Sequence, residues 1–340
     1  MAFPGRMLVW GTGAIGGTIA AHIGRAGHDV TCVDVDAAHL ERIAASGLTV
    51  DLPEGGIVAH VGAARPDALQ GTFDLVFLAV KADRTLQAMQ ALMPFRSPDA
   101  PVVSLQNGLC ELEIAGLVGQ RNVIGAFINF GADITGPGHI TVGNRGAVVV
   151  GELDGHIGER TSTVRDLLAL YEPKAIASDN IFGFLWGKQA YSAVLKSSAL
   201  SKAPLVAFME DPRWQAANIG LIREVLCVAR AEGVAPLGFD GFDPADFEAG
   251  DQRAVAGLNS MADLYRGSAK THSSAWRDIA VARARTDAAA QVGPIFVAAQ
   301  RHAIPVPLLR GMIDRITALE DGKAMQGDAL VEEWAQGCPR

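Results

Sequence analysis

Two lysines and a serine recur at regular spacing along an otherwise apolar segment in the second half of the 340-residue chain. In FGFLWGKQAYSAVLK, residues 182–196, Lys188, Ser192 and Lys196 follow one another every four residues. This spacing places the three side chains on one face of a helix. Such a face could line a polar cleft, where a lysine ammonium can donate a proton and stabilise negative charge. The same stripe is equally typical of the solvated side of a surface helix, so periodicity alone leaves both interpretations open.

Two further polar side chains follow apolar runs in the first half. Lys81 comes directly after VFLAV, and Asn107 follows VVSLQ and precedes a glycine. The apolar runs are typical of buried parallel strands, whose carboxyl ends face the ligand crevice of an α/β protein. We expect both side chains at that edge. The alternatives are a lysine that simply reaches solvent and an ordinary Asn-Gly turn.

The segment GTGAIGG has the glycine spacing of a dinucleotide-binding loop. A strand-like run, MLVW, precedes it, and a helix-like and a second strand-like segment follow, which is the context that such a loop requires. The first glycine allows a tight turn, the second lets the backbone approach a pyrophosphate, and the third allows close packing of helix and strand. We therefore predict a cofactor loop that consists of Gly11, Thr12, Gly13, Ala14, Ile15 and Gly16.

Asp34 ends the second strand-like run, DVTCVDVD, where a carboxylate can accept hydrogen bonds from the adenosine ribose. A second carboxylate, Asp36, follows closely. Because carboxylates repel a 2'-phosphate, we favour NAD(H) as the cofactor. NADP(H) remains the alternative, since Arg42 or Lys81 could bind a phosphate.

The alternation of apolar runs with helical periodicity predicts a doubly wound parallel sheet in the first half of the chain. The strands are expected within residues 7–10, 29–36, 74–80, 101–105 and 122–130. Residues 131–152 contain short β segments with glycine turns, which we interpret as an antiparallel extension that closes the domain. From residue 181 onward the pattern is nearly all helical. We predict an α/β protein with a Rossmann-type domain over residues 1–180 and an all-helical domain over residues 181–335.

The composition argues against several classes of protein. The net charge is −8, which gives no electrostatic footprint for nucleic acid. No segment reaches the roughly 18 unbroken apolar residues of a membrane span. The histidines and the four cysteines show no metal-ligand spacing, so no metal site is expected. Widely separated cysteines are typical of reduced thiols, and we expect a cytoplasmic protein.

Six segments together resemble the ketopantoate reductase (2-dehydropantoate 2-reductase) family in content, order and spacing. They are GTGAIGG, LAVKA, SLQNGL, LWGKQAYS, SSAWRDI and RTD, at residues 11–17, 78–82, 104–109, 185–192, 273–279 and 285–287. The resemblance extends from end to end of the chain. It implies the same two-domain fold, with the acid substrate bound by the helical domain, and a homodimer formed through that domain.

The resemblance also implies roles for individual residues. Lys188 matches the family's catalytic lysine, and Ser274 resembles the serine that holds the substrate carboxylate. Lys81 and Asn107 are similar to the lysine and asparagine that lie beside the nicotinamide ribose and the substrate. Asp287 stands where the family usually has a glutamate close to the active site.

The chain departs from the family pattern at two places. The family commonly has substrate-contacting asparagines at the positions of Ser192 and Lys196. A shorter side chain leaves room and an added cation can pair with a second anionic group, which points to a larger or more acidic substrate than ketopantoate. Lys270, His272 and Arg277 could add to this effect. Many family members also have an arginine for the 2'-phosphate where this chain has valine, which again favours NAD(H).

We therefore expect an NAD(P)-dependent oxidoreductase that transfers a hydride between the nicotinamide and a 2-oxo acid/2-hydroxy acid pair, with Lys188 as acid/base. One alternative is a hydroxy-acid, sugar-acid or opine-type dehydrogenase that works mainly in the oxidative direction. An alternative of another class is a non-catalytic NAD(P)-binding sensor, which would not need Lys188, Ser274 and Asp287 together.

Overall fold

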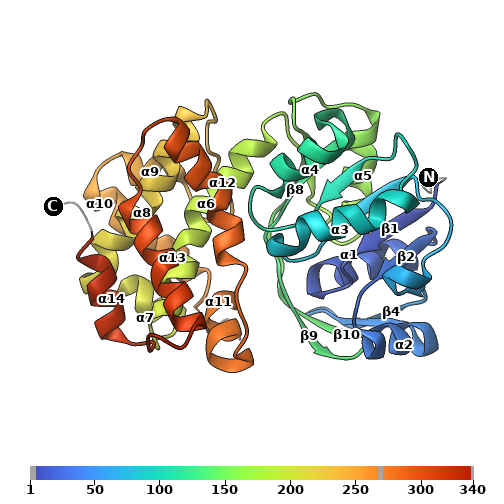
Figure 1. Cartoon of the computed structure of the whole chain (residues 1–340), viewed down its shortest axis with the longest axis horizontal. Helices are drawn as coiled ribbons and strands as arrows, with labels where there is room; N and C mark the ends of the chain where they lie inside the picture. The colour runs from blue at the N-terminus through green and yellow to red at the C-terminus, as the bar shows by residue number, and fades with distance from the viewer. Residues whose placement is uncertain (1–4, 267–270, 338–340) are drawn as a thin grey trace. The chain divides into compact units, whose positions relative to one another are not determined.

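The chain divides into two compact units, Met1–Ile181 and Phe182–Arg340. The computed structural model describes residues 5–266 and 271–337, so Lys270 and Cys338 lie outside the described residues. In Figure 1 the first unit runs from blue to green and the second from yellow-green to red.

The first unit is built on a large, mostly parallel sheet with the strand order β12-β11-β8-β7-β6-β1-β2-β5. Its strands are β1 Met7–Trp10, β2 Val30–Val33, β5 Gly62–Ala64, β6 Leu75–Leu78, β7 Val102–Ser104, β8 Val123–Ile128, β11 Val148–Glu152 and β12 Ile176–Ala177. Its α-helices are α1 Ala14–Arg25, α2 Ala37–Ser46, α3 Thr85–Leu92, α4 Cys110–Val118 and α5 Glu159–Ala169. Strands β1, β6, β7 and β8 are fully buried, as the continuous apolar runs predict.

The order of the central strands fixes where a ligand can bind. The chain winds outward from β1 in one direction through β2 and in the other through β6, so the connections diverge between β1 and β6. Trp10 pairs with Val33 on one side and Leu78 on the other, and Leu78 pairs with Ser104. The loops after these four strands therefore leave from the same carboxyl edge, at the topological switch point of the sheet.

A second, smaller sheet has the strand order β4-β3-β10-β9. Its strands are β3 Leu48–Asp51, β4 Ile57–Ala59, β9 Gly131–Gly136 and β10 His139–Asn144. Helix α1 packs between the two sheets, since it contacts β1 and β2 on one side and β3, β4, β9 and β10 on the other. The expectation that residues 131–152 form one antiparallel extension is therefore only half right. Strand β11 pairs antiparallel with β8, but β9 and β10 leave the large sheet.

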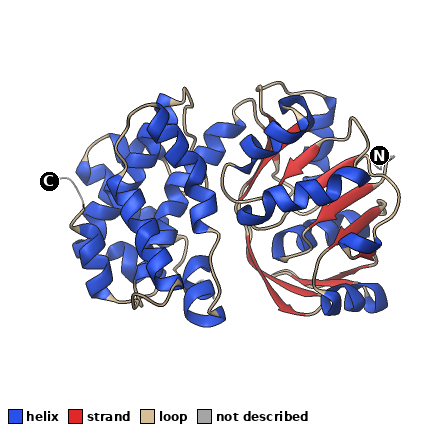
Figure 2. Cartoon of the chain, in the orientation of Figure 1, coloured by secondary structure: helices blue, strands red, loops and turns tan. Residues whose placement is uncertain are grey.

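The described residues of the second unit form helices and loops, apart from an isolated bridge between Phe239 and Phe242 (Figure 2). Its α-helices are α6 Ile181–Ser197, α7 Leu205–Glu210, α8 Pro212–Ala231, α9 Pro244–Glu248, α10 Asp251–Asp263, α11 Ser274–Arg277, α12 Ala288–Arg301, α13 Pro307–Glu320 and α14 Asp328–Ala335. The predicted fold class, a Rossmann-type sheet followed by an all-helical domain, is confirmed.

The nearly all-helical pattern predicted from residue 181 onward is interrupted between residues 278 and 287. Residues Asp278–Ala282 form a π-helical turn, and Arg283 then adopts a left-handed conformation (φ 51°) that ends it. Helix α12 begins only at Ala288. Among the described residues, no helix is both long and apolar enough to cross a membrane.

Candidate active site

The glycine loop between β1 and α1 has the geometry that a dinucleotide requires. Gly11 has φ 94°, and a Cβ there would lie 2.8 Å from the backbone nitrogen of Val80. At Gly16 a Cβ would lie 2.1 Å from the carbonyl oxygen of Gly11, so helix and loop are in direct contact. At Gly13, in contrast, a Cβ would meet no atom within 4 Å. The loop is thus closed toward the protein and open at its middle glycine, as a bound pyrophosphate would need.

The N-terminus of α1 is suited to an anion. No side chain caps the helix, and its first turn carries no acidic residue. The first backbone N–H groups of a helix have no partner within the helix and carry a partial positive charge. Thr12, Ala14 and Ile15 complete the loop; Thr12 is buried and its hydroxyl donates to the carbonyl oxygen of Val33 at 3.2 Å.

Asp34 braces the glycine loop. Its carboxylate accepts hydrogen bonds from the backbone N–H groups of Thr12, Val35 and Asp36 at 2.8, 2.7 and 3.1 Å. A carboxylate offers about four acceptor positions, so capacity for a ribose hydroxyl remains. The side chain of Val35 is 74% exposed beside it.

A cation that the sequence analysis missed lies near this position. Arg65 follows β5 and donates from Nη1 to the carbonyl oxygen of Val35 at 3.2 Å. It also forms an ion pair with Asp67, with Nε and Oδ1 3.4 Å apart. Its position directly after a strand could have indicated this role. However, the sequence of β5 is only GAA, and this strand was not predicted.

Lys81 and Asn107 are both exposed in the loops that follow β6 and β7. The buried side chain of Gln106 ties these loops together, because its Nε2 donates to the carbonyl oxygen of Val80 at 3.0 Å and to Thr85 Oγ1 at 2.9 Å. The glycine loop, Asp34, Lys81 and Asn107 therefore all lie at the carboxyl edge of one sheet.

The polar residues of the second unit are arranged on α6. Lys188 and Ser192 are half-buried, and Lys196 is 6% exposed. The Lys196 ammonium donates to Ser192 Oγ at 2.8 Å, and Ser192 Oγ donates to the carbonyl oxygen of Gln189 at 3.3 Å. No residue of α6 is exposed, so this polar face is at most partly open to solvent.

Burial lowers the pKa of Lys196 from 10.5 to about 8, and the negative charge of Asp287 acts in the opposite direction. Asp287 precedes α12, and its Oδ1 accepts a hydrogen bond from Gln291 Nε2 at 2.8 Å. The structure therefore brings Asp287 into the electrostatic surroundings of Lys196.

Ser274 is exposed at the start of α11. Its neighbour Ser273 is buried, and the Ser273 and Ser198 hydroxyl oxygens lie 3.1 Å apart. Trp276 Nε1 donates to the carbonyl oxygen of Ser201 at 3.0 Å. These contacts attach the start of α11 to the segment that follows α6.

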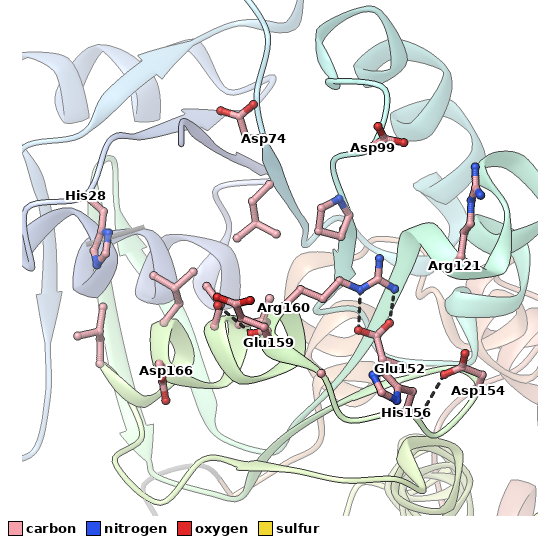
Figure 3. A pocket seen from close by; sticks show the side chains of 17 residues that line it. His28, Asp74, Asp99, Arg121, Glu152, Asp154, His156, Glu159, Arg160 and Asp166 are labelled. Atoms are coloured by element: carbon pink, nitrogen blue, oxygen red, sulfur yellow. Dashed lines mark hydrogen bonds and ion pairs between the residues drawn. The ribbon is translucent and has the colours of Figure 1, made fainter. Parts of the chain in front are cut away.

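A cavity of about 1210 Å³ in the first unit lies away from the glycine loop (Figure 3). Asp74 and Pro101, which line it, immediately precede β6 and β7, so the cavity is at the amino edge of the sheet. Its most buried charge, Glu152, is held by Arg160 through contacts of 2.7 and 2.5 Å. The cavity thus lies at the edge opposite the glycine loop. Among the described residues, no group of three or more His, Cys, Asp or Glu side chains could hold a metal ion.

Comparison with known proteins agrees with this arrangement. The model of the family described as ketopantoate reductase PanE/ApbA matches residues 7–155, and the model described as ketopantoate reductase PanE/ApbA C terminal matches residues 180–320. Together they cover most of the chain. The chain therefore belongs to the ketopantoate reductase family.

Individual relatives are distant but nearly full-length. The 2-dehydropantoate 2-reductase of Mesorhizobium japonicum is 26% identical over 77% of this chain and 86% of its own length. That of Archaeoglobus fulgidus is 28% identical over 77% of this chain and 85% of its own length. A crystal structure of a PanE/ApbA family ketopantoate reductase from Ralstonia eutropha JMP134 is similar with a TM-score of 0.77 and 26% identity, over 95% of this chain and 99% of that one.

The ternary structure of D-mandelate dehydrogenase with NADH and anilino(oxo)acetate has a TM-score of 0.79 over 95% of this chain and 99% of that one. At 19% identity, this likeness concerns the fold alone. From its family, the chain is an oxidoreductase that acts on CH–OH groups and depends on a nicotinamide cofactor.

Proposed function

We propose that this enzyme transfers a hydride between NAD(H) and a 2-oxo acid/2-hydroxy acid pair, with Lys188 as the acid/base. The polar face of α6 carries the proposal. A helix whose other sides are buried presents Lys188, Ser192 and Lys196 in one line. Such a face in a family of reductases is best explained by contact with a polar substrate.

The residues of the first unit fit a dinucleotide. The open middle of the loop at Gly13 and the uncapped start of α1 would hold the pyrophosphate, and Asp34 would accept from the ribose. Lys81 and Asn107 would lie beside the nicotinamide ribose. When bound, the nicotinamide supplies the hydride for reduction or accepts it in oxidation.

Lys188 would donate the proton in reduction and accept it in oxidation. As a 2-oxo acid is reduced, negative charge develops on the carbonyl oxygen, and the Lys188 ammonium both stabilises it and donates the proton that completes the hydroxyl. In the oxidative direction the neutral amine accepts that proton. Ser274 would hold the substrate carboxylate by a hydrogen bond from its hydroxyl, and Asp287 would adjust the charge balance of the lysines on α6.

The preference for NAD(H) over NADP(H) rests on the end of β2. A 2'-phosphate there would face the carboxylates of Asp34 and Asp36, and the valine between them offers no positive charge. Arg65 is a cation that could favour a 2'-phosphate, although it already pairs with Asp67. Fluorescence titration should give an affinity at least about tenfold higher for NADH than for NADPH, a difference of about 1.4 kcal/mol. The variant Arg65→Ala should lower the affinity for NADPH more than the affinity for NADH.

We further propose a cytoplasmic homodimer. The free thiols of Cys32 and Cys227 fit a reducing compartment. A ketopantoate reductase from Staphylococcus aureus that is similar in fold is described as dimeric, at 18% identity and a TM-score of 0.67 over 95% of this chain and all of that one. Light scattering after gel filtration measures the mass directly, and a monomeric mass would rule the dimer out.

A paired kinetic screen tests the function. NADH and NADPH oxidation would be followed with ketopantoate and a panel of 2-oxo acids, and the reverse reaction with 2-hydroxy and sugar acids. We expect Lys188→Ala to lower kcat about 10²- to 10⁴-fold, whereas Lys202→Ala, at an exposed lysine beyond α6, should behave as wild type. Turnover that is unchanged in Lys188→Ala would overturn the assignment. Activity found mainly in the oxidative direction would identify a hydroxy-acid dehydrogenase. Because the chain belongs to a family of oxidoreductases, the alternative of a non-catalytic sensor is not favoured.

A further inference from the structure

Lys196 is a buried cation whose hydrogen bonding is incomplete. A lysine ammonium has three N–H donors. Within residues 5–266 and 271–337, Ser192 Oγ is the one acceptor that the Lys196 ammonium reaches, at 2.8 Å. The side chain is only 6% exposed, so solvent cannot readily supply the missing acceptors.

A lysine with a purely structural role is not expected to be buried with a single hydrogen bond. Buried charges in proteins are normally paired, and long cationic side chains otherwise extend until the ammonium reaches water. Asp287 contributes a charge of opposite sign, which raises the pKa of Lys196 but is outweighed by burial. The lowered pKa agrees with this geometry, because the site disfavours the charged form in the absence of a closer anion.

The position of the ammonium along α6 relates it to the proposed reaction centre. Residues 188 and 196 are about 12 Å apart along the helix axis, at 1.5 Å per residue. The contact with Ser192, however, shows that the Lys196 side chain folds back by one turn toward Lys188. A group bound by Lys196 would therefore lie on the Lys188 side of residue 196, on the same face of α6.

We propose that Lys196, together with Ser192, binds a second carboxylate of the substrate, and that the enzyme acts on dicarboxylic 2-oxo acids or their 2-hydroxy products. This inference rests on the proposed function, because it takes Lys188 as the group that meets the reacting carbonyl. Ser274 then holds the carboxylate next to that carbonyl. The Lys196 ammonium meets the carboxylate at the far end of the substrate, and the Ser192 hydroxyl can turn to donate to the same group.

The buried Lys196 ammonium would also discriminate dicarboxylic acids from acids with an uncharged distal end. A substrate with an apolar or uncharged distal end would leave the ammonium buried with its single hydrogen bond, and it would gain nothing from the cation. A dicarboxylic acid supplies the acceptors that are missing. Sites that are built to hydrogen-bond a group reject analogues that lack it. We expect a preference on the order of 10² between acids of equal length, the scale of one hydrogen bond to a charged group.

Calorimetric binding measurements on the full-length enzyme test the proposal without turnover. The protein is saturated with oxidised cofactor and titrated with 2-oxoglutarate and, as the matched monocarboxylic acid, 2-oxopentanoate; oxaloacetate and 2-oxobutanoate form a shorter pair. The variants are Lys196→Met, which keeps the length of the side chain, and Lys202→Met as the surface control. Circular dichroism and cofactor affinity verify that Lys196→Met is folded.

We expect wild type and Lys202→Met to bind a dicarboxylic acid about 10²-fold more tightly than its matched partner, and Lys196→Met to lose this preference. At pH 8 the bound carboxylate should also draw a proton onto the lysine. Titrations in two buffers of different ionisation heat should show proton uptake in wild type and not in Lys196→Met. Equal affinities in wild type, no dicarboxylate binding at all, or a preference that persists in Lys196→Met would overturn the inference.

Failure of the proposed function would give a different result. If the family activity is present but Lys188→Ala turns over as wild type, the role of Lys188 is wrong. If turnover depends on Lys188 and monocarboxylic acids are used as well as dicarboxylic ones, the function stands and only the assignment of Lys196 is lost.

Discussion

Two glycines of the cofactor loop depend on different neighbours, so alanine at each should have different effects. The backbone at Gly13 is extended, with φ −70° and ψ −166°, and a Cβ there meets nothing within 4 Å. A Cβ at Gly16 would lie 2.1 Å from the Gly11 carbonyl oxygen and 2.9 Å from the Ala79 Cβ. The first methyl group would occupy only space for ligand, whereas the second would collide with the protein.

We therefore predict that Gly13→Ala leaves Tm within about 2 °C of wild type and weakens NADH binding at least about tenfold. Gly16→Ala should lower the free energy of unfolding by about 1–3 kcal/mol or more, as overpacking does. Thermal unfolding and fluorescence titration measure the two effects. Wild-type NADH affinity in Gly13→Ala would mean that the pyrophosphate does not approach this loop.

Lys196 should also influence stability in a pH-dependent way. Below pH 8 the folded protein holds a buried ammonium, which opposes folding. Between about pH 8 and 10.5 the folded protein has lost a proton that the unfolded chain still carries, so this unfavourable contribution fades as the pH rises. At pH 7, we predict that Lys196→Met raises the free energy of unfolding by about 1–3 kcal/mol relative to wild type. Urea titrations at successive pH values should show this gap closing above pH 8; a gap that stays constant would contradict the buried-charge explanation.

At the scale of elements, Gln106 links the loops that follow β6 and β7 and carry Lys81 and Asn107. The variant Gln106→Met keeps the volume and loses the hydrogen bonds to Val80 and Thr85. We predict a loss of stability of about 1–3 kcal/mol and a rise in KM that exceeds the change in kcat, because the loops would hold cofactor and substrate less firmly. Gln90→Met, at an exposed position in α3, is the matched control. An unchanged KM in a destabilised Gln106→Met would show that the loops do not need this link.

The elements that could be predicted from the sequence are those with strong local patterns. Strands β1, β6, β7 and β8 are continuous apolar runs because both of their faces are covered. Strands β3, β4 and β5 were not predicted, since they are short and partly exposed. Strand β3 pairs with β10, which is distant in the sequence. The switch of β9 and β10 to a second sheet depends on this long-range pairing, which local periodicity does not reveal.

The candidate site shows the same division. Spacing alone placed Lys188, Ser192 and Lys196 on one helical face, but it could not decide between a solvated and a buried face. That distinction depends on tertiary packing, as does the approach of Asp287 to Lys196. The place of Arg65 beside Val35 likewise requires the pairing of β5 with β2, which sequence patterns did not indicate.

At the scale of the whole molecule, each unit carries one part of the proposed chemistry. The first unit holds the glycine loop and Asp34, which would bind the cofactor, and the second holds the lysines of α6, which would act on the substrate. Variants should therefore separate the two functions. Substitutions in the loop should change cofactor affinity, whereas substitutions on α6 should change substrate selectivity and rate while cofactor affinity is retained.

The rate of hydride transfer in a single turnover tests the central claim most directly. Enzyme saturated with NADH would be mixed with its best 2-oxo acid, and the loss of NADH fluorescence followed for wild type, Lys188→Met and the control Lys202→Met. We predict a rate about 10²- to 10⁴-fold lower in Lys188→Met, with NADH affinity unchanged and the control equal to wild type. A Lys188→Met rate within about a factor of two of wild type, less than about 0.5 kcal/mol in activation free energy, would show that Lys188 does not supply the proton.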